Sequence, residues 1–228
     1  LVGSEMCIRD RIDENRVLSF YGLQQLNTSP RIGLKALMDV ASRKNSFSIT
    51  DVVFSLAPRI NAAGRIEHGN KAVELLVQQD FSIAKEKADY IDNHNFSRKE
   101  LDKSITREAL AMIVQGANST VVCNEKWHKG VVGIVASRLI ETHYRPTIVL
   151  TESNGKLTGS ARSVSGFDIY NAIDACSDLI EQFGGHKYAA GLTLKKENLT
   201  AFIQRFEEVV STTITVSYTH LTLPTIYS

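Results

Sequence analysis

The sequence predicts an α/β protein in two parts, a helical part followed by a smaller domain with a mixed β-sheet. A charged run from residue 81 to about 115 contains neither proline nor glycine. Its apolar residues recur at helical spacing, which predicts one helix of about 35 residues. Before this run the apolar spacing is helical, whereas after it strand-like and helix-like runs alternate, which favours a sheet covered by helices.

The helical part is expected to contain several short helices. Apolar residues at helical spacing mark 16–26, 34–42 and 70–78. Another helix begins at Ser48 or Thr50, either of which can cap it, and Pro58 helps to stop it. The long helix ends at 115–119, and this change of pattern predicts a domain boundary near Gly116.

The second part is expected to form an α/β sandwich with a mixed or parallel sheet. Strands are predicted at 119–125, 146–152, 156–163 and 188–194, and helices at 129–144, 167–183 and 196–210.

Composition limits the function classes. The chain has 228 residues and a formal net charge of +1, so any basic site must be local. No apolar run approaches the ~20 residues that span a bilayer, and no secretory leader is visible. Three cysteines without CxxC spacing fit a reducing compartment, so the cytoplasm is the expected location. A monomer that does not contact membranes is also expected.

The two ends differ from the rest of the chain. The opening "LVGSEMCIRDR" and the closing "VSYTHLTLPTIYS" resemble translated sequencing-adapter sequence. The alternative is a genuine C-terminal strand, because "TITVSYTHLTL" alternates acceptably. Residues 1–11 and 211–228 are therefore left out of the interpretation.

The stretch "APRINAAGR" is the first candidate site. Arg59 and Arg65, with Asn61 between them, are expected in a loop between helices. The planar arginine group suits bidentate phosphate contacts. The alternative is a solvated loop whose arginines pair with acids such as Glu67.

The stretch "EKWHKGVVGIVASRL" is the second. A helix beginning around His128 to Gly130 would present backbone N–H groups to an anion. Trp127 would offer a face for stacking a base. The alternative is that Trp127 belongs to the core and that Gly133 only allows close helix packing.

The stretch "TGSARS" is the third. Ser160 and Arg162 stand two apart on a strand, so they share a face and suit a terminal phosphate. The alternative is a polar edge strand that faces water.

The stretch "EQFGGHKYAAGLTL" is the fourth. It places Gly184, Gly185, His186 and Lys187 between a predicted helix and a predicted strand. A glycine that ends a helix explains one of the glycines but not the pair. Backbone and imidazole donors beside a ligand, with Lys187 adding charge, are the functional interpretation.

The sequence lacks the motifs of several other kinds of enzyme. GxGxxG, GxSxG, HExxH and the P-loop are missing from the sequence. Asp92 and His94 are close in sequence, but a spacing of two directs them to different sides of a helix, so no metal site is predicted in this chain.

Together these motifs and "DENRVLSFYGLQQLN" resemble the DHH phosphoesterase family, in particular its bacterial exonucleases specific for single-stranded DNA. The resemblance covers about residues 12–210 in the family's order and spacing. It implies the end of a DHH catalytic domain (12–80), a connecting helix (81–116) and a DHH-associated nucleic-acid-binding domain (117–210). The implied reaction is 5′-to-3′ hydrolysis of single-stranded DNA in recombination and repair.

The resemblance also implies roles for the residues that match its motifs. Arg59, Asn61 and Arg65 would lie near the scissile phosphate, and Ser160 and Arg162 would bind the 5′ phosphate. The pair of glycines and His186 would line the substrate groove. Ala161 stands where the family often has glycine.

The family's two Mn²⁺ or Mg²⁺ ions bind motifs upstream of "DENRV", which predicts that this chain lacks them and is inactive by itself. A single-strand-binding protein is a candidate partner. The alternatives are a DHH phosphodiesterase acting on oligoribonucleotides or cyclic dinucleotides, and a noncatalytic nucleic-acid-binding module.

Overall fold

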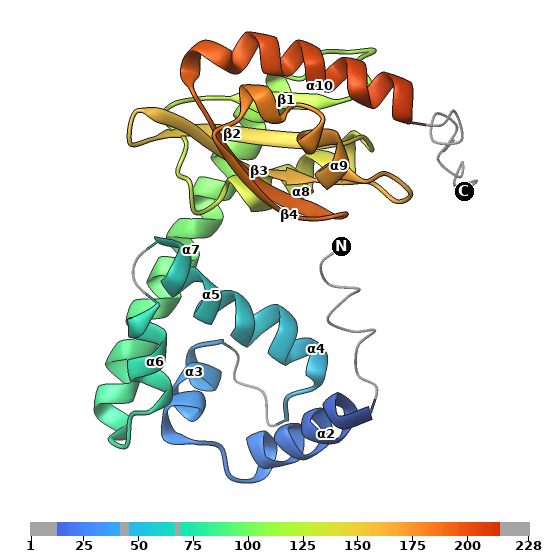
Figure 1. The fold of residues 1–228 in the computed structure, drawn as a ribbon. Coiled ribbons are helices and arrows are strands. Elements are labelled where there is room, and N and C mark those ends of the chain that lie inside the picture. Colours follow the sequence, from blue (N-terminus) through green and yellow to red (C-terminus); the bar gives the residue numbers. More distant parts are fainter. Residues whose placement is uncertain (1–12, 42–45, 67–68, 215–228) are drawn as a thin grey trace, which may run out of the picture. The chain divides into compact units, whose positions relative to one another are not determined.

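The computed structural model describes residues 13–41, 46–66 and 69–214 (Figure 1). The chain divides into two compact units, Leu1–Leu101 and Asp102–Ser228. The adapter-like N-terminal segment lies outside the described residues, and so does the C-terminal one from residue 215 onward.

The first unit consists of helices around one apolar core. Leu37, Leu56 and Leu75, which come from three different segments, are almost completely buried together. The predicted cap at Ser48 is confirmed, because its hydroxyl accepts the Asp51 N–H while the Asp51 carboxylate accepts the Ser48 N–H. The segments are α2 (Asp13–Thr28), α3 (Ile32–Ala41), α4 (Ile49–Asp51), the π-helix η1 (Val52–Leu56), α5 (Ala57–Ile66), α6 (Asn70–Leu76) and the first part of α7 (Phe81–Ala111).

The prediction that "APRINAAGR" forms a loop is wrong, because it forms helix α5. Pro58 does not stop the helix. Proline has no N–H, and its ring collides with the carbonyl four residues earlier in a regular α-helix. The π-turn of η1 changes this register, since the Ala57 N–H donates to the Val52 carbonyl five residues back. The chain therefore remains helical through the proline.

The long helix is confirmed as α7, with 31 residues and a length of roughly 46 Å. Its two ends pack in different cores. Ala88 and Ile91 belong to the core of the first unit, whereas Ile105 and Ala109 belong to a core of the second. The division between the units therefore falls inside one continuous helix.

The second unit is built on a five-stranded sheet with the order β1-β2-β3-β5-β4. Strands β1 and β2 are parallel and all other pairs are antiparallel, so the predicted mixed sheet is confirmed. The strands are β1 (Thr120–Cys123), β2 (Thr147–Ser153), β3 (Lys156–Arg162), β4 (Gln182–His186) and β5 (Ala189–Leu194).

Helices cover both faces of this sheet, but unequally (Figure 1). On one face Phe202 and Phe206 pack against β2, β3 and β5 residues such as Leu192. On the other face α8 and the end of α7 pack against Val122 and Val149, which belong to β1 and β2. The remaining elements are α8 (Val132–Thr142), α9 (Ile169–Asp174), η2 (Ser177–Leu179), η3 (Lys196–Asn198) and α10 (Leu199–Thr213).

The predicted helix over 167–183 is too long. Helix α9 ends at Asp174, and Gln182–His186 forms the edge strand β4. The strand turns back into β5 through Lys187 and Tyr188, since His186 is the partner of Ala189. Two glycines carry no apolar alternation, so the sequence pattern gave no sign of this strand.

Among the described residues, no helix has both the length and the apolar character needed to cross a bilayer.

Glu207 of α10 holds the segment that leads into β1. Its carboxylate accepts the backbone N–H groups of Asn118 and Ser119, at 2.7 and 2.8 Å, and both of their side chains. Burial by itself raises the pKa of this carboxyl. The hydrogen bonds outweigh burial, so the pKa of Glu207 lies below its ordinary value.

We predict that Glu207→Gln lowers the free energy of unfolding by about 1–2 kcal/mol at pH 7, because hydrogen bonds to a charged acceptor are lost. A depressed folded-state pKa stabilises the fold fully above the unfolded pKa, near 4.5. That contribution is lost as the pH falls through the folded pKa. Urea unfolding at a series of pH values should show the two proteins converging below about pH 4.5. A constant difference down to about pH 3 would contradict this.

Candidate nucleic-acid interface

Ser160 and Arg162 share one face of β3, as predicted. The Arg162 Nη1 donates to Ser160 Oγ at 2.6 Å and to the Ala161 carbonyl at 2.8 Å. Both residues are partly exposed. A guanidinium and a hydroxyl are therefore held side by side, which is an arrangement that can bind the oxygens of a phosphate.

The first turn of α8 lies against this pair. A Cβ atom placed on Gly133 would come within 2.9 Å of Arg162 Nη2 and 3.1 Å of Ser160 Oγ. Glycine therefore allows the guanidinium to lie close to the helix backbone. The structure brings together two stretches, "KGVVGIV" and "TGSARS", that were separate candidate sites in the sequence.

The register of the sheet places Gly184 and His186 in line with Ser160 and Arg162 across the strands. We call each such line of directly paired residues a row. Ser160 is the partner of Gly191, which is the partner of Gly184. In the same way, Arg162 is the partner of Ala189, and Ala189 is the partner of His186. Since neighbouring strands lie about 4.8 Å apart, the Arg162 and His186 backbones are roughly 10 Å apart. Direct partners and alternate residues point to the same face, so both rows share one face.

On this face, the described residues leave much of the part over β5 and β4 exposed. We call it the open face and define it by Gly184, His186, Ala189 and Gly191. The two glycines and His186 are exposed, and Ala189 is partly buried. The described part of α8 and α7 covers only the β1–β3 side. The backbone of two strands is thus accessible beside Ser160 and Arg162.

Gly184 and Gly185 are adjacent, but the structure gives a different reason for glycine at each position. A Cβ on Gly185 would come within 2.3 Å of the Ala189 carbonyl oxygen, so the pairing of β4 with β5 requires glycine there. A Cβ on Gly184 would meet nothing within 4 Å. Packing among the described residues does not explain Gly184, whereas a ligand that approaches the open face would.

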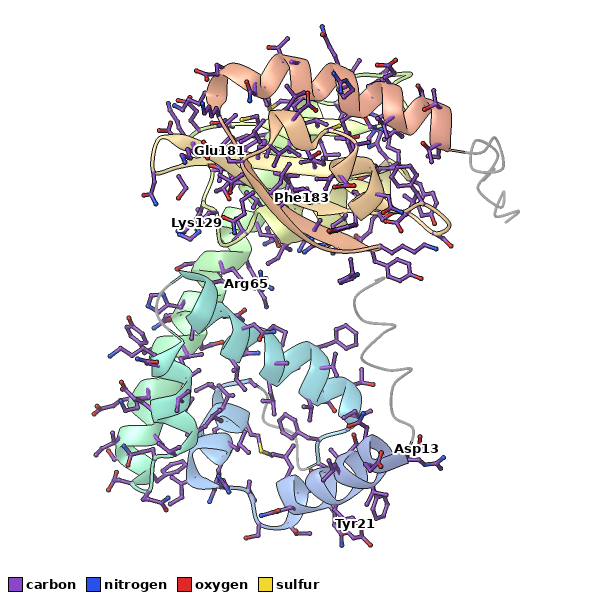
Figure 2. The ribbon with its side chains drawn as sticks, in the orientation of Figure 1. Asp13, Tyr21, Arg65, Lys129, Glu181 and Phe183 are labelled. Carbon is purple, nitrogen blue, oxygen red and sulfur yellow. The ribbon has the colours of Figure 1, made fainter. Side chains whose placement is uncertain are left out.

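His186 presents one ring nitrogen at the end of the open face. Its Nδ1 accepts the N–H of Tyr188 at 3.2 Å. In the neutral ring the proton therefore belongs on Nε2, which becomes a hydrogen-bond donor for a ligand. Lys187, in the exposed turn that follows, adds a positive charge. Strand β4 can be found in Figure 2 by its labelled residue Phe183, which comes just before the two glycines.

The anion site expected around His128 to Gly130 relied on a helix start that is wrong, while the binding roles of these two residues stay predictions. Helix α8 begins at Val132, later than predicted, and residues before it form turns. The Gly130 N–H donates to His128 Nδ1 at 3.1 Å, and the Val131 N–H donates to the His128 carbonyl at 3.0 Å. These donors are used inside the turn and not directed at a ligand.

Trp127 does not offer a stacking face. It is only 5% exposed and belongs to the core between α7, α8 and the sheet. Its Nε1 donates to Glu108 of α7 at 2.8 Å. The alternative weighed from the sequence, a core tryptophan, is the one that the structure supports.

In the first unit, α5 separates the three candidates of "APRINAAGR". The Arg59 side chain is hydrogen-bonded within the protein. Its Nε donates to Asp92 of α7 at 2.7 Å, and its Nη1 donates to the Ser55 carbonyl at 2.8 Å. Asn61 and Arg65 are four residues apart on an exposed helix face, and Figure 2 labels Arg65 near the end of α5. They border a hollow of about 460 Å³ between α5 and α6.

The described residues do not fit a metal centre. No three His, Cys, Asp or Glu side chains among them come together in a way that could hold a metal ion. Asp92, which the sequence placed near His94, is instead the partner of Arg59.

From the sequence, Gly133 was considered as a glycine that permits close approach to an anion, whereas Ala189 and Gly191 were not named as site residues. Their small size was visible, and it was the only signal that could have identified them. The positions of Ala189 and Gly191 depend on strand register, and that of Gly133 depends on how α8 packs against β3; the sequence predicted neither.

Comparison with known proteins shows what the chain is similar to. Residues 111–212 match the DHHA1 domain. The single-stranded-DNA-specific exonuclease RecJ of Bacillus subtilis is 42% identical over 209 residues, which are 89% of this chain and 27% of that protein. RecJ of Escherichia coli is 35% identical over 211 residues, 86% of this chain and 37% of that protein. The chain thus spans well under half of these relatives.

Solved structures show the same similarity. The crystal structure of RecJ from Thermus thermophilus in complex with Mg²⁺ has a TM-score of 0.80 at 32% identity and covers 87% of this chain and 31% of that one. A second structure, exonuclease RecJ bound to manganese, has a TM-score of 0.76 at 31% identity and covers 88% and 51%.

The two adjacent glycines allow a matched test of the fold at the open face. Gly185→Ala is expected to lower the free energy of unfolding by about 2 kcal/mol or more, because its Cβ collides with the β5 backbone. Gly184→Ala should change it by less than about 0.5 kcal/mol. Urea unfolding monitored by circular dichroism measures both. Equal effects of the two substitutions would show that this strand pairing is wrong.

Proposed function

We propose that this chain, whose residues 111–212 belong to the DHHA1 domain family and which is homologous over most of its length to one part of RecJ, is a segment of a metal-dependent 5′-to-3′ exonuclease specific for single-stranded DNA. In this proposal the segment binds the sugar–phosphate chain of the substrate.

One observation supports the proposal most strongly. Ser160, Arg162 and His186 lie on one sheet face, and the first turn of α8 has glycine where Ser160 and Arg162 approach it. Donors for phosphate oxygens therefore line an area whose centre, at Gly184 and Gly191, has no side chain. A single strand can approach such an area closely, whereas a bulky side chain would hold it away.

Each residue has a defined part in this proposal. Arg162 offers a planar, permanently charged group to the terminal phosphate, and Ser160 adds a hydroxyl beside it. His186 donates from Nε2 to a neighbouring phosphate or sugar oxygen. Lys187 supplies charge at the exposed turn. None of these contacts reads a base, so the expected binding depends little on sequence.

The metal ions of such an enzyme would be held by residues other than those described. The Thermus thermophilus structure contains Mg²⁺ and another RecJ structure contains manganese, while the described residues of this chain offer no three metal-binding side chains together. We therefore assign this chain substrate binding and derive no metal-dependent step from it.

The remaining assignments rest on the family resemblance. Asn61 and Arg65 would lie near the scissile phosphate, whereas Arg59 would act indirectly by holding α5 against α7. The parent protein would be a cytoplasmic monomer active in DNA recombination and repair, with a single-strand-binding protein as a partner. Cys123 and Cys176 are free thiols, which fits the reducing cytoplasm.

The relatives reported above are all RecJ exonucleases. The alternatives considered from the sequence, a phosphodiesterase for oligoribonucleotides or cyclic dinucleotides and a noncatalytic binding module, are not favoured.

We predict that Arg162→Ala weakens binding of a 5′-phosphorylated oligonucleotide by about tenfold or more and binding of its 5′-hydroxyl counterpart much less. The reason is that the guanidinium contacts the terminal phosphate. Fluorescence anisotropy at one fixed salt concentration measures both affinities, since phosphate contacts depend on salt.

Arg205→Ala is the matched control. Arg205 lies on α10, which covers the opposite face of the sheet, and its Nη1 is 3.6 Å from Asp178. The control removes the same charge and should leave the preference for the 5′ phosphate unchanged. Equal weakening of both oligonucleotides by Arg162→Ala would remove that residue from the proposed role.

We also predict that the purified chain binds single-stranded DNA without cleaving it in Mn²⁺, because its described residues do not form a metal site. Gel analysis of a labelled oligonucleotide tests this. Cleavage that a chelator abolishes would refute the assignment of this chain to binding only.

A further inference from the structure

The turn between β4 and β5 carries an exposed aromatic ring on a fixed backbone. The Tyr188 carbonyl accepts the Ser163 N–H at 3.0 Å, and the Lys187 carbonyl accepts the Ile169 N–H at 3.2 Å. The Tyr188 N–H donates to His186. The Tyr188 side chain nevertheless remains 41% exposed. These hydrogen bonds hold the backbone of the turn, while the Tyr188 ring remains exposed.

Two neighbours place the ring at the end of the open face. The Tyr188 and His186 ring centroids are 6.1 Å apart in an edge-to-face arrangement. Lys187 Nζ lies 6.0 Å from the Tyr188 ring centroid. His186 is in the same row as Arg162. The aromatic ring, a positive charge and the phosphate-binding pair thus lie at the same end of the sheet.

This combination is the one that single-strand-binding surfaces use. A positively charged groove follows the backbone, and flat aromatic side chains stack on the bases. A tyrosine on a fixed turn also loses little conformational entropy when a base stacks on it. Trp127, the stacking residue expected from the sequence, is buried, whereas Tyr188 is exposed.

We propose that Tyr188 stacks on a nucleobase within the first three nucleotides of a single strand whose 5′ phosphate lies at Ser160 and Arg162, and that Lys187 contacts the adjoining backbone. This inference rests on the proposed function and adds to it a base contact on the β4 side of the open face. Because every base has a flat face, the contact supplies affinity and register, with little sequence preference.

Tyr170 provides a matched control on the other side of the sheet. It is 37% exposed, similar to Tyr188, and its ring pairs with Phe183 at 5.5 Å. Phe183 packs against the core that α9 and α10 cover, so this aromatic pair belongs to the opposite face. Removing Tyr170 changes the same chemical group without touching the open face.

The experiment measures affinities of the full 228-residue chain for a 5′-phosphorylated oligonucleotide and for three versions that each lack one base at positions 1, 2 or 3. The proteins are wild type, Tyr188→Ala, Tyr188→Leu, Tyr188→Phe and Tyr170→Ala. Tyr188→Leu keeps an apolar side chain without a ring, and circular dichroism verifies that each variant folds.

For the complete oligonucleotide, Tyr188→Ala and Tyr188→Leu should each weaken binding by about tenfold, whereas Tyr188→Phe and Tyr170→Ala should stay within about twofold. At one abasic position the wild type should lose a similar factor, and Tyr188→Leu should add no further loss, because the base and ring act on each other. Independent losses at all three positions, or wild-type affinity of Tyr188→Leu, would overturn the proposal.

The phosphate site is tested separately by the effect of Arg162→Ala on 5′-phosphate preference. If that preference disappears as expected while the abasic series shows no coupling, only the stacking proposal fails. If the wild type shows no 5′-phosphate preference, the proposed function fails, whatever the abasic series shows.

Discussion

The pairing of β3, β5 and β4 brings the chemically distinctive residues of the second unit together. Because side chains alternate along each strand, this register places Ser160, Arg162 and His186 on one face. A slip of one residue would turn that face toward the core. Gly185 fixes the pairing by permitting close contact with β5, while Gly184 leaves the surface accessible. The adjacent glycines therefore serve the fold and the surface, respectively.

The surrounding helices keep this area uncovered while supporting it. Helices α9 and α10 supply the apolar side chains behind the sheet, and α8 covers the front only over β1 to β3. An ion pair between Arg138 of α8 and the buried Asp102 of α7, with nitrogen and oxygen 2.8 Å apart, fixes the two helices to each other. The first turn of α8 is thus held where Gly133 meets Arg162.

Elements with a strong periodic pattern were predicted correctly from the sequence, whereas features that depend on tertiary contacts were not. Helix α7, the strands β1, β2, β3 and β5, and the shared face of Ser160 and Arg162 follow from local spacing. Pro58 misled the prediction of α5 because a π-turn accommodates it. Strand β4 has little hydrophobic pattern, since glycines occupy its centre. Burial of Trp127 and the pairing of Arg59 with Asp92 depend on distant segments.

In the proposed function, the open face and the adjoining turn of α8 contact a single-stranded sugar–phosphate chain. Amide chemical-shift mapping by NMR tests it directly, with isotope-labelled chain titrated with a 5′-phosphorylated oligonucleotide. The largest changes should occur at Gly133, Arg162, Gly184 and Gly191, with little change along α10. Changes concentrated on α9 and α10, with these four amides unaffected, would contradict it.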